Sequence, residues 1–167
     1  MEKRVVLPCF DGMWIDLIWE PGSNVNTLVE NNTVIIQGNK IGLHSIAKQM
    51  LYFSSNSVPP GAHVHFETWL PSWSGYSLVL SVVGKTFSLY DYIDDPSLSI
   101  QLPTIGNNHV ALHQNAFFAV SVRDEITIEA NQSGYYHVGC ILESLIESSL
   151  NHIEFFNPKL VFQKICG

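Results

Sequence analysis

One succession of secondary-structure patterns occurs twice in this chain, and it limits the possible folds more than any other feature of the sequence. The first copy has an expected strand at Thr33–Gln37, a helix ending near Phe53, and strands at His63–Phe66 and Leu78–Leu80. The second copy has a strand at Glu125–Glu129, a helix ending near Leu150, and strands at His152–Phe155 and Leu160–Phe162. This order predicts the α+β class, with antiparallel sheets, two helices and two similar ββαββ halves.

The first parts of the two copies align without a gap, Val25–Met50 onto Phe117–Leu142. Asn39 and Gly42 then match Asn131 and Gly134 at the same offset of 92 residues. Asn39 is expected to cap the first helix, and the apolar stripe after it, at three- and four-residue spacing, predicts one buried helix face. Two explanations stay open: a duplicated unit, or two unrelated segments that share their physical patterning.

Three hairpins are expected before the helices. Each consists of two strand-like runs around a turn, and Asn, Asp and Gly are residues that tight turns favour. The first pairs Val5–Phe10 with Trp14–Trp19 around Asp11-Gly12. The others pair Val25–Glu30 with Thr33–Gln37 around Asn31-Asn32, and Phe117–Val122 with Glu125–Glu129 around Arg123-Asp124.

The segment between the two copies is acidic and lacks a clean hydrophobic period. It contains Asp91, Asp94, Asp95 and Pro96. We therefore predict a first half at residues 1–84, a linker at 85–98 and a second half at 99–167, with one pseudo-symmetric domain as the alternative. With 167 residues, the chain is long enough to bury a core without disulfides or metals.

Net charge and cysteine usage restrict the partners and the compartment. Fifteen acidic and eight basic residues give a formal charge of −7, which disfavours nucleic acid because phosphate neutralisation needs clustered Lys and Arg. The same charge suits a basic protein partner. No apolar run is long enough to cross a membrane. Three widely spaced cysteines, Cys9, Cys140 and Cys166, fit a reduced cytoplasmic protein.

A histidine-bearing strand is the candidate for metal chemistry. His63, His65 and Glu67 alternate along an expected strand, so their side chains point to one face. Two imidazoles and a carboxylate are zinc ligands, and an open fourth position makes such a site catalytic. The alternative is a polar strand face opposite Val64 and Phe66. Because no other catalytic motif is present, we favour this alternative and predict no cofactor, metal or catalytic residue.

Two aromatic segments are candidates for partner binding. Trp69 and Trp73 flank a loop with proline and serine, and a second segment combines aromatic with acidic residues: Tyr90, Asp91, Tyr92, Asp94 and Asp95. Rigid aromatic side chains anchor protein interfaces, and the carboxylates suit a basic partner. The alternative interpretation places Trp69 and Tyr76 at the edge of the core and the acids in a solvated linker.

A series of short motifs resembles a known family. Gly38-Asn39-Lys40, Gly42-Leu43 and Ile46-Ala47 are followed by Val58-Pro59, by Gly61, by His63-x-His65-Phe66 and by Ser77–Leu80. Over about Asn32–Val83 this series resembles a family of small bacterial immunity proteins from polymorphic-toxin and contact-dependent competition systems.

The resemblance implies a stoichiometric function. Such a protein binds a cognate toxin in the producing cell and blocks its active site or substrate path, and it needs no cofactor. Two other functions stay open: a metal-dependent enzyme built on the histidine-bearing strand, and a structural module that self-associates through exposed sheet edges. The sequence does not determine the oligomeric state.

Overall fold

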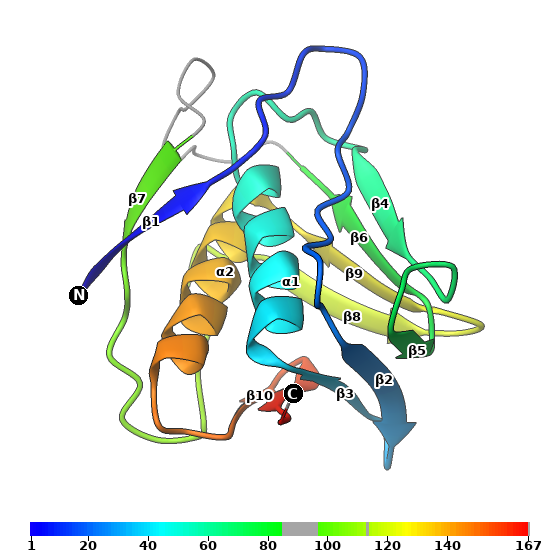
Figure 1. Cartoon of the computed structure of the whole chain (residues 1–167), viewed down its shortest axis with the longest axis vertical. Helices are drawn as coiled ribbons and strands as arrows, with labels where there is room; N and C mark the ends of the chain where they lie inside the picture. The colour runs from blue at the N-terminus through cyan, green and yellow to red at the C-terminus, as the bar shows by residue number, and fades with distance from the viewer. Residues whose placement is uncertain (85–96, 113, 167) are drawn as a thin grey trace.

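Two helices lie side by side in the molecule, and strands from distant parts of the chain surround them (Figure 1). The structure, a computed structural model, describes residues 1–84, 97–112 and 114–166. Its elements in chain order are β1 (Glu2–Val6), β2 (Val25–Glu30), β3 (Thr33–Gly38), α1 (Lys40–Phe53), β4 (His63–Phe66), β5 (Trp73–Gly75), β6 (Leu78–Val82), β7 (Ser97–Gln101), β8 (Phe118–Val122), β9 (Ile126–Ala130), α2 (Gln132–Glu147), β10 (His152–Phe156) and β11 (Lys159–Lys164).

Two of the three predicted hairpins are confirmed. Between β2 and β3, Asn31 and Asn32 have φ of 50° and 62°, the left-handed conformation that a two-residue hairpin turn requires and that asparagine tolerates. In the second half, β8 pairs antiparallel with β9. Local turn chemistry therefore sets the register of both pairs.

Each helix begins after an asparagine that makes the same kind of contact. Asn39 Oδ1 accepts hydrogen bonds from the N–H groups of Gly42 (2.8 Å) and Asn24 (3.1 Å), which confirms the predicted N-cap. Asn131 Oδ1 accepts a hydrogen bond from the Gly134 N–H (2.7 Å). Both caps satisfy amide groups that the first helical turn leaves unpaired.

Glycine is required in the first turn of both helices because the chain passes close by. A Cβ atom at Gly42 would lie 2.8 Å from the carbonyl oxygen of Asn24, and one at Gly134 would lie 2.2 Å from that of Phe117. These carbonyl groups immediately precede β2 and β8. The matched Asn and Gly residues therefore hold each helix against the start of its own hairpin.

The two larger sheets each combine strands from both halves of the chain. Their strand orders are β10-β11-β3-β2-β5 and β4-β6-β9-β8. β11 runs parallel to β3 with Leu160 beside Val34, and β6 runs parallel to β9 with Leu78 beside Ile126. The predicted α+β class is confirmed. The sheets are mixed rather than antiparallel, because the hairpin of one half meets the final strands of the other.

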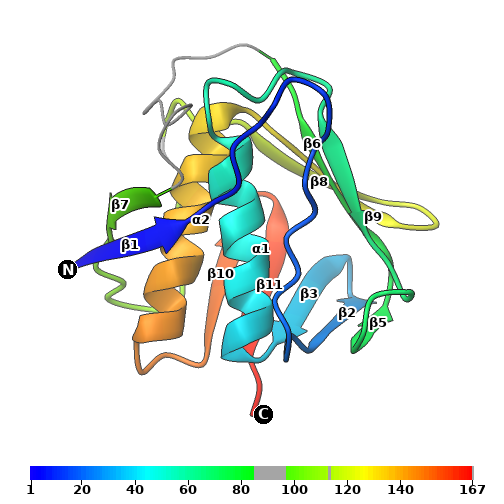
Figure 2. The same cartoon turned by 45° about the horizontal axis from the view of Figure 1, so that its top comes forward.

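This strand exchange bears on the predicted division into residues 1–84 and 99–167. Neither half forms a larger sheet from its own strands, and Figure 2 shows β10 and β11 beneath the helices next to β3. The division itself stays a prediction. Residues 85–96 of the predicted linker lie outside the described residues, and β7 begins at Ser97.

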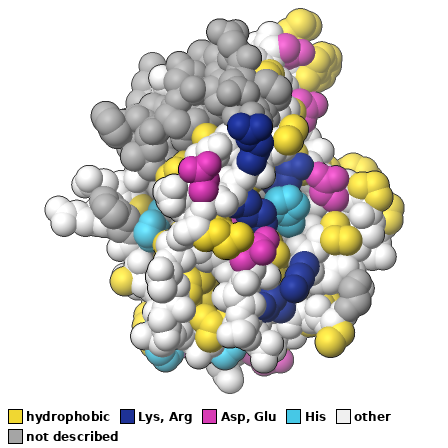
Figure 3. All heavy atoms as spheres, turned by 60° about the vertical axis from the view of Figure 1, so that its left-hand side comes forward, with side chains coloured by type: hydrophobic (Ala, Val, Ile, Leu, Met, Phe, Trp, Pro, Cys, Tyr) yellow, Lys and Arg dark blue, Asp and Glu magenta, His cyan; other side chains and the backbone are white. Residues whose placement is uncertain are grey.

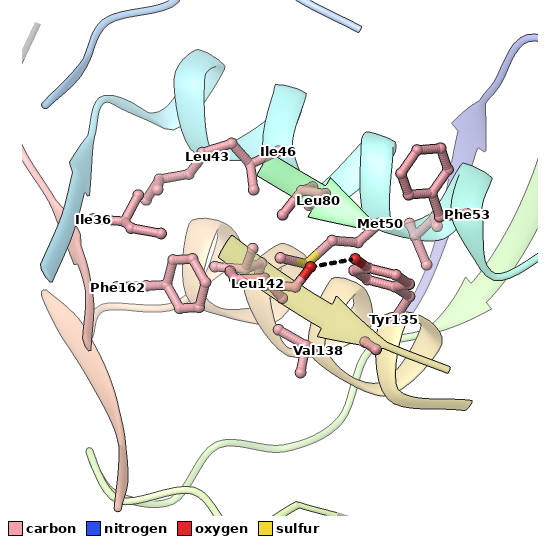
Figure 4. Close-up of a cluster of buried hydrophobic side chains, with 14 of the residues drawn as sticks. Ile36, Leu43, Ile46, Met50, Phe53, Leu80, Tyr135, Val138, Leu142 and Phe162 are labelled. Atoms are coloured by element: carbon pink, nitrogen blue, oxygen red, sulfur yellow. Dashed lines mark hydrogen bonds between the residues drawn. The ribbon is translucent and has the colours of Figure 1, made fainter. Parts of the chain in front are cut away.

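The core lies between the helices and the inner faces of the sheets (Figure 4). Apolar side chains of α1 and α2 converge there with Ile36 of β3, Leu80 of β6 and Phe162 of β11, all of them buried. Fully burying one such side chain contributes about 1.5–3 kcal/mol. The core therefore joins elements of both halves into one packed unit.

The predicted hairpin around Asp11-Gly12 is wrong, although its turn is present. Asp11 Oδ1 accepts hydrogen bonds from the N–H groups of Met13 (2.8 Å) and Trp14 (3.0 Å), and Gly12 has φ of 90°. The residues on either side do not pair with each other. β1 pairs instead with β7 in a separate two-stranded sheet.

Polar side chains of α1, rather than a partner strand, hold residues 14–24. The buried Gln49 accepts a hydrogen bond from the Ile18 N–H (2.7 Å) and donates one to the Asp16 carbonyl (3.1 Å). Ser45 Oγ accepts one from the Glu20 N–H (2.9 Å). These side chains satisfy backbone groups that a hairpin partner would otherwise pair. Figure 2 shows this dark blue segment running alongside α1 toward β2.

Candidate functional site

The predicted partner-binding residues fall into three groups. Trp69, on the loop after β4, is 67% exposed. Trp73, in β5, is 4% exposed and belongs to the core. The remaining predicted residues lie outside the described part of the chain: Tyr90, Asp91, Tyr92, Asp94 and Asp95. Of these two tryptophans, only Trp69 exposes its ring to solvent.

An aromatic cluster supports the loop that carries Trp69. The Trp73 ring stacks on Phe66 with centroids 5.4 Å apart, and Trp19 meets these two rings edge to face at 5.6 and 6.1 Å. Trp19 Nε1 also donates a hydrogen bond to the Pro71 carbonyl (3.1 Å). The loop therefore rests on packed rings, and a preorganised loop loses little conformational entropy on binding.

Glu67 orients the Trp69 indole. Trp69 Nε1 donates a hydrogen bond to Glu67 Oε2 (2.9 Å), and Glu67 Oε1 lies 3.9 Å from His65 Nδ1. The rings of His63 and His65 are 5.3 Å apart and inclined at 76°. Two imidazoles on β4, and one carboxylate and one indole on the loop after it, thus form an exposed row.

The predicted alternation of His63, His65 and Glu67 on one strand face is confirmed, but the three side chains do not converge on one point. His63 Nδ1 lies 3.2 Å from the Gly61 carbonyl oxygen, and Glu67 is engaged by Trp69. Among residues 1–84, 97–112 and 114–166, no group of three or more His, Cys, Asp or Glu side chains is placed to hold a metal ion. The row exposes hydrogen-bonding groups and ring faces to solvent.

Two adjoining hollows flank Trp69. One, of about 520 Å³, is lined by Ile15, Leu17, His63, Val64, His65, Glu67 and Trp69. The other, of about 660 Å³, is lined by residues of the segment 17–24, by the loop at 69–72 and by Asn39. Leu17 and Trp69 line both hollows. We call the lining of the two hollows, together with Met13 and Trp14, the Trp69 surface.

Sequence reasoning missed the contribution of the N-terminal segment to this surface. Trp14 is 71% exposed and, like Met13, immediately precedes the residues that line the first hollow. The N–H groups of Trp14 and Met13 bond to the Asp11 carboxyl and lower its pKa. Asp11-Gly12 does signal the turn, but assigning residues 14–19 to a strand hides the exposed Trp14 ring.

The Trp69 surface comes from segments without lysine or arginine. The chain has neither residue type between Arg4 and Lys40, nor between Lys48 and Lys85. The same segments carry several carboxylates at or near the surface, including Asp11, Asp16 and Glu67. Carboxylates beside exposed indole rings complement Lys and Arg side chains through ion pairing and cation–π contact.

Basic residues gather instead where the helices meet β1. Figure 3 shows basic, acidic and histidine side chains intermixed on that face of the molecule. Lys48 Nζ lies 2.6 Å from Glu20 Oε1, and Lys3 Nζ lies 2.8 Å from Glu147 Oε1. The hydrogen bond from each lysine lowers the pKa of its carboxylate partner. Lys3 and Lys48 are therefore each paired with a carboxylate, and Glu20 also lines the second hollow beside Trp69.

The fold and this surface together define an α+β protein with an exposed surface of aromatic and acidic side chains. The model of the family Immunity protein 32 matches residues 33–102, from β3 to just beyond β7, and confirms the predicted resemblance to immunity proteins over that segment. No curated protein and no solved structure shows significant similarity to the chain. Neither α1 nor α2, the helices of the described residues, is long and apolar enough to cross a membrane.

Proposed function

We propose that this protein is an immunity protein that binds a cognate bacterial toxin in a stoichiometric complex and thereby neutralises it. It acts in the cytoplasm of the producing cell and blocks the active site or the substrate path of the toxin, without a cofactor. The observation that carries the proposal is that the segment similar to immunity proteins, residues 33–102, contains β4, Glu67 and Trp69. The part of the Trp69 surface that follows β4 therefore lies within the family-like part of the chain, and residues 13–24 supply the rest.

The Trp69 surface has the composition of an interface centre. Tryptophan is enriched among the few residues that carry most of the binding energy, and truncating such a residue costs about 2–4 kcal/mol. Trp69 and Trp14 are exposed in the free protein, while Trp19 and Trp73 hold the loop from beneath. Binding buries the outer rings without reorganising the inner ones.

The charge of the surface selects a basic region on the toxin. Glu67 is held beside the Trp69 ring by the hydrogen bond to Nε1. A Lys or Arg side chain of the toxin that stacks on the ring brings its charge next to the carboxylate. Such complementarity steers encounter and raises the association rate, and salt screens this effect.

Co-expression with the toxin encoded beside this gene tests the proposal by cell survival. The wild-type chain is expected to protect, and Trp69→Ala is expected to protect poorly while accumulating to the same level. The matched control is Phe156→Ala, another exposed aromatic residue, on β10 at the opposite edge of its sheet from β5. Failure of the wild-type chain to protect would contradict the function. Full protection by Trp69→Ala would contradict the assigned surface.

A further inference from the structure

The outer edge of β8 is the least protected edge of the two larger sheets. Within the described residues, only β9 pairs with β8. Phe118–Val122 contains no charged residue, proline or glycine, which are the residues that usually prevent an edge strand from pairing with another chain. Phe117, just before the strand, is 51% exposed, and Val122, at its end, is 38% exposed.

The other three edges carry such protection. β10 is covered by residues 108–110, because the Glu154 N–H donates to the Asn108 carbonyl (2.6 Å) and the Val110 N–H donates to the Glu154 carbonyl (2.9 Å). β5 is only three residues long and ends at Gly75, with φ of 88°. β4 carries two histidines, and the segment with Ile15 lies beside it.

The strand that corresponds to β8 in the first half has a cover. β2 pairs with β3 as β8 pairs with β9, and β5 covers the outer edge of β2 from Val25–Trp73 to Thr27–Gly75. β5 belongs to the long connection between β4 and β6. The corresponding connection between β10 and β11 consists of Asn157 and Pro158. Among the residues that the structure describes, the second half therefore has no segment at that place to cover β8.

The ladder between β8 and β9 determines which backbone groups point outward. The Asn131 N–H donates to the Phe117 carbonyl, and the Arg123 N–H donates to the Glu125 carbonyl. Bonded residues alternate along an antiparallel pair, so the backbone groups of Phe118, Val120 and Val122 point away from β9. The β9 partners of these residues are buried. The apolar row of the core face therefore continues to the open edge.

We propose that β8 pairs antiparallel with β8 of a second copy of this chain, so that two four-stranded sheets become one continuous sheet. A twofold axis at Val120 places Phe118 opposite Val122 of the second copy and aligns the outward N–H and C=O groups of both strands. β8 suits self-pairing because it contains no charged residue, so the twofold axis brings no like charges opposite each other.

The Trp69 surface stays accessible in this dimer. It lies along β4, and β4 and β8 are opposite edges of the same sheet. The self-association therefore does not depend on the proposed toxin binding, and the two can be tested separately.

Sedimentation equilibrium of the full chain tests the dimer over a range of concentrations. The wild type is expected to reach twice the 18.7 kDa mass of the chain. In Ala119→Lys/Ser121→Lys, the axis places each new lysine opposite a lysine of the second copy. Both side chains point away from the helices, and Ala119 pairs with Glu129, which tolerates a lysine there. We expect dimerisation to weaken by roughly tenfold or more, with an unchanged circular dichroism spectrum.

The double variant Gln101→Lys/Thr104→Lys adds the same charge at exposed positions outside β8 and is expected to stay dimeric. A wild-type chain that stays monomeric up to about 100 µM, a typical micromolar test of weak association, would overturn the proposal. So would a dimer that the lysines in β8 leave unchanged. If the backbone amides of β8 are protected from hydrogen exchange only in a one-to-one complex with the toxin, the toxin and not a second copy binds this edge, and the proposal is wrong.

Discussion

The Nζ atom of Lys3 lies 2.5 Å from Oε2 of Glu143, a carboxylate whose side chain has no exposed surface. Its other oxygen contacts Nδ1 of His44. Because Lys3 belongs to β1, His44 to α1 and Glu143 to α2, one buried carboxyl group joins the N-terminal strand to both helices. Burial opposes the positive charge of Lys3, but hydrogen bonds to Glu143 and Glu147 outweigh burial and raise the pKa of Lys3.

Removing Lys3 leaves the buried carboxylate with the His44 ring as its remaining side-chain partner. We expect Lys3→Met to lower the free energy of unfolding by about 3 kcal/mol, because breaking a buried ion pair costs on that order. Arg4→Met, at the exposed neighbouring position of β1, is the control and is expected to stay within about 0.5 kcal/mol. Chemical denaturation measures both. Equal effects of the two substitutions would contradict a structural role of the Lys3–Glu143 contact.

Acid is expected to destabilise the protein through its paired surface carboxylates. Lys48 lowers the pKa of Glu20, and Lys3 lowers that of Glu147. A carboxyl with a lowered folded-state pKa contributes stability above its unfolded value, and this contribution is lost as the pH falls. The melting temperature should therefore drop as the pH falls through the ordinary value of 4.5 and below.

The variant Lys48→Met checks the origin of this acid sensitivity. Without Lys48, Glu20 no longer gains stability from ionisation, so the melting temperature should depend less steeply on pH in the acid range. Lys3 acts in the opposite direction. Its raised pKa gives stability that is fully present below 10.5 and lost only as the pH rises further. An acid profile identical to that of the wild type would contradict the Glu20–Lys48 contribution.

The two described tryptophans of the predicted interface should behave differently when truncated. Trp73→Ala removes a buried ring from the Phe66 and Trp19 cluster and should cost about 3–5 kcal/mol of stability. Trp69→Ala removes an exposed ring and should change stability by about 0.5 kcal/mol or less. Thermal unfolding monitored by circular dichroism separates them. Comparable losses for both would show that Trp69 supports the fold.

The two asparagine caps should contribute about equally to the stability of the protein. Asn39→Ala and Asn131→Ala each remove an acceptor for two amide groups and should each cost about 1–2 kcal/mol. Asn39→Asp keeps the acceptor and places a negative charge at the helix N-terminus, which offsets the loss of the donor to the Gly22 carbonyl, so it should cost less than Asn39→Ala. Urea unfolding of the variants measures the difference. A negligible loss at either alanine would argue against that cap.

The order of elements follows from local signals, and the structure confirms most of it. Asparagine turns, the Asn39 cap and alternation along β4 each depend on a few neighbouring residues. The gap-free alignment of the two copies fails at the strand before each turn. The gap-free alignment matches Val25 with Phe117 and Gly38 with Ala130. In the structure Val25 pairs with Gly38, but Phe118 rather than Phe117 pairs with Ala130. The second turn is one residue shorter, so Phe117 is exposed while Phe118 is buried.

Strand exchange and the N-terminal segment could not be predicted from the sequence. Parallel pairing of β3 with β11 joins residues more than a hundred positions apart, and local pattern contains no information about such partners. The run from Trp14 to Trp19 has strand composition, but Gln49 and Ser45 satisfy its backbone from α1. The exposure of Trp14 depends on those long-range contacts. The sequence therefore indicates Trp69 as a candidate but does not indicate the surface around it.

Isothermal titration calorimetry with the toxin encoded beside the gene tests the central claim, that the Trp69 surface binds a toxin, most directly. We predict one-to-one binding by the wild type, a dissociation constant weakened roughly 30-fold in Trp69→Ala, equivalent to about 2 kcal/mol, and a nearly unchanged constant in Phe156→Ala. Tight binding by Trp69→Ala together with loss of binding in Phe156→Ala would contradict the account.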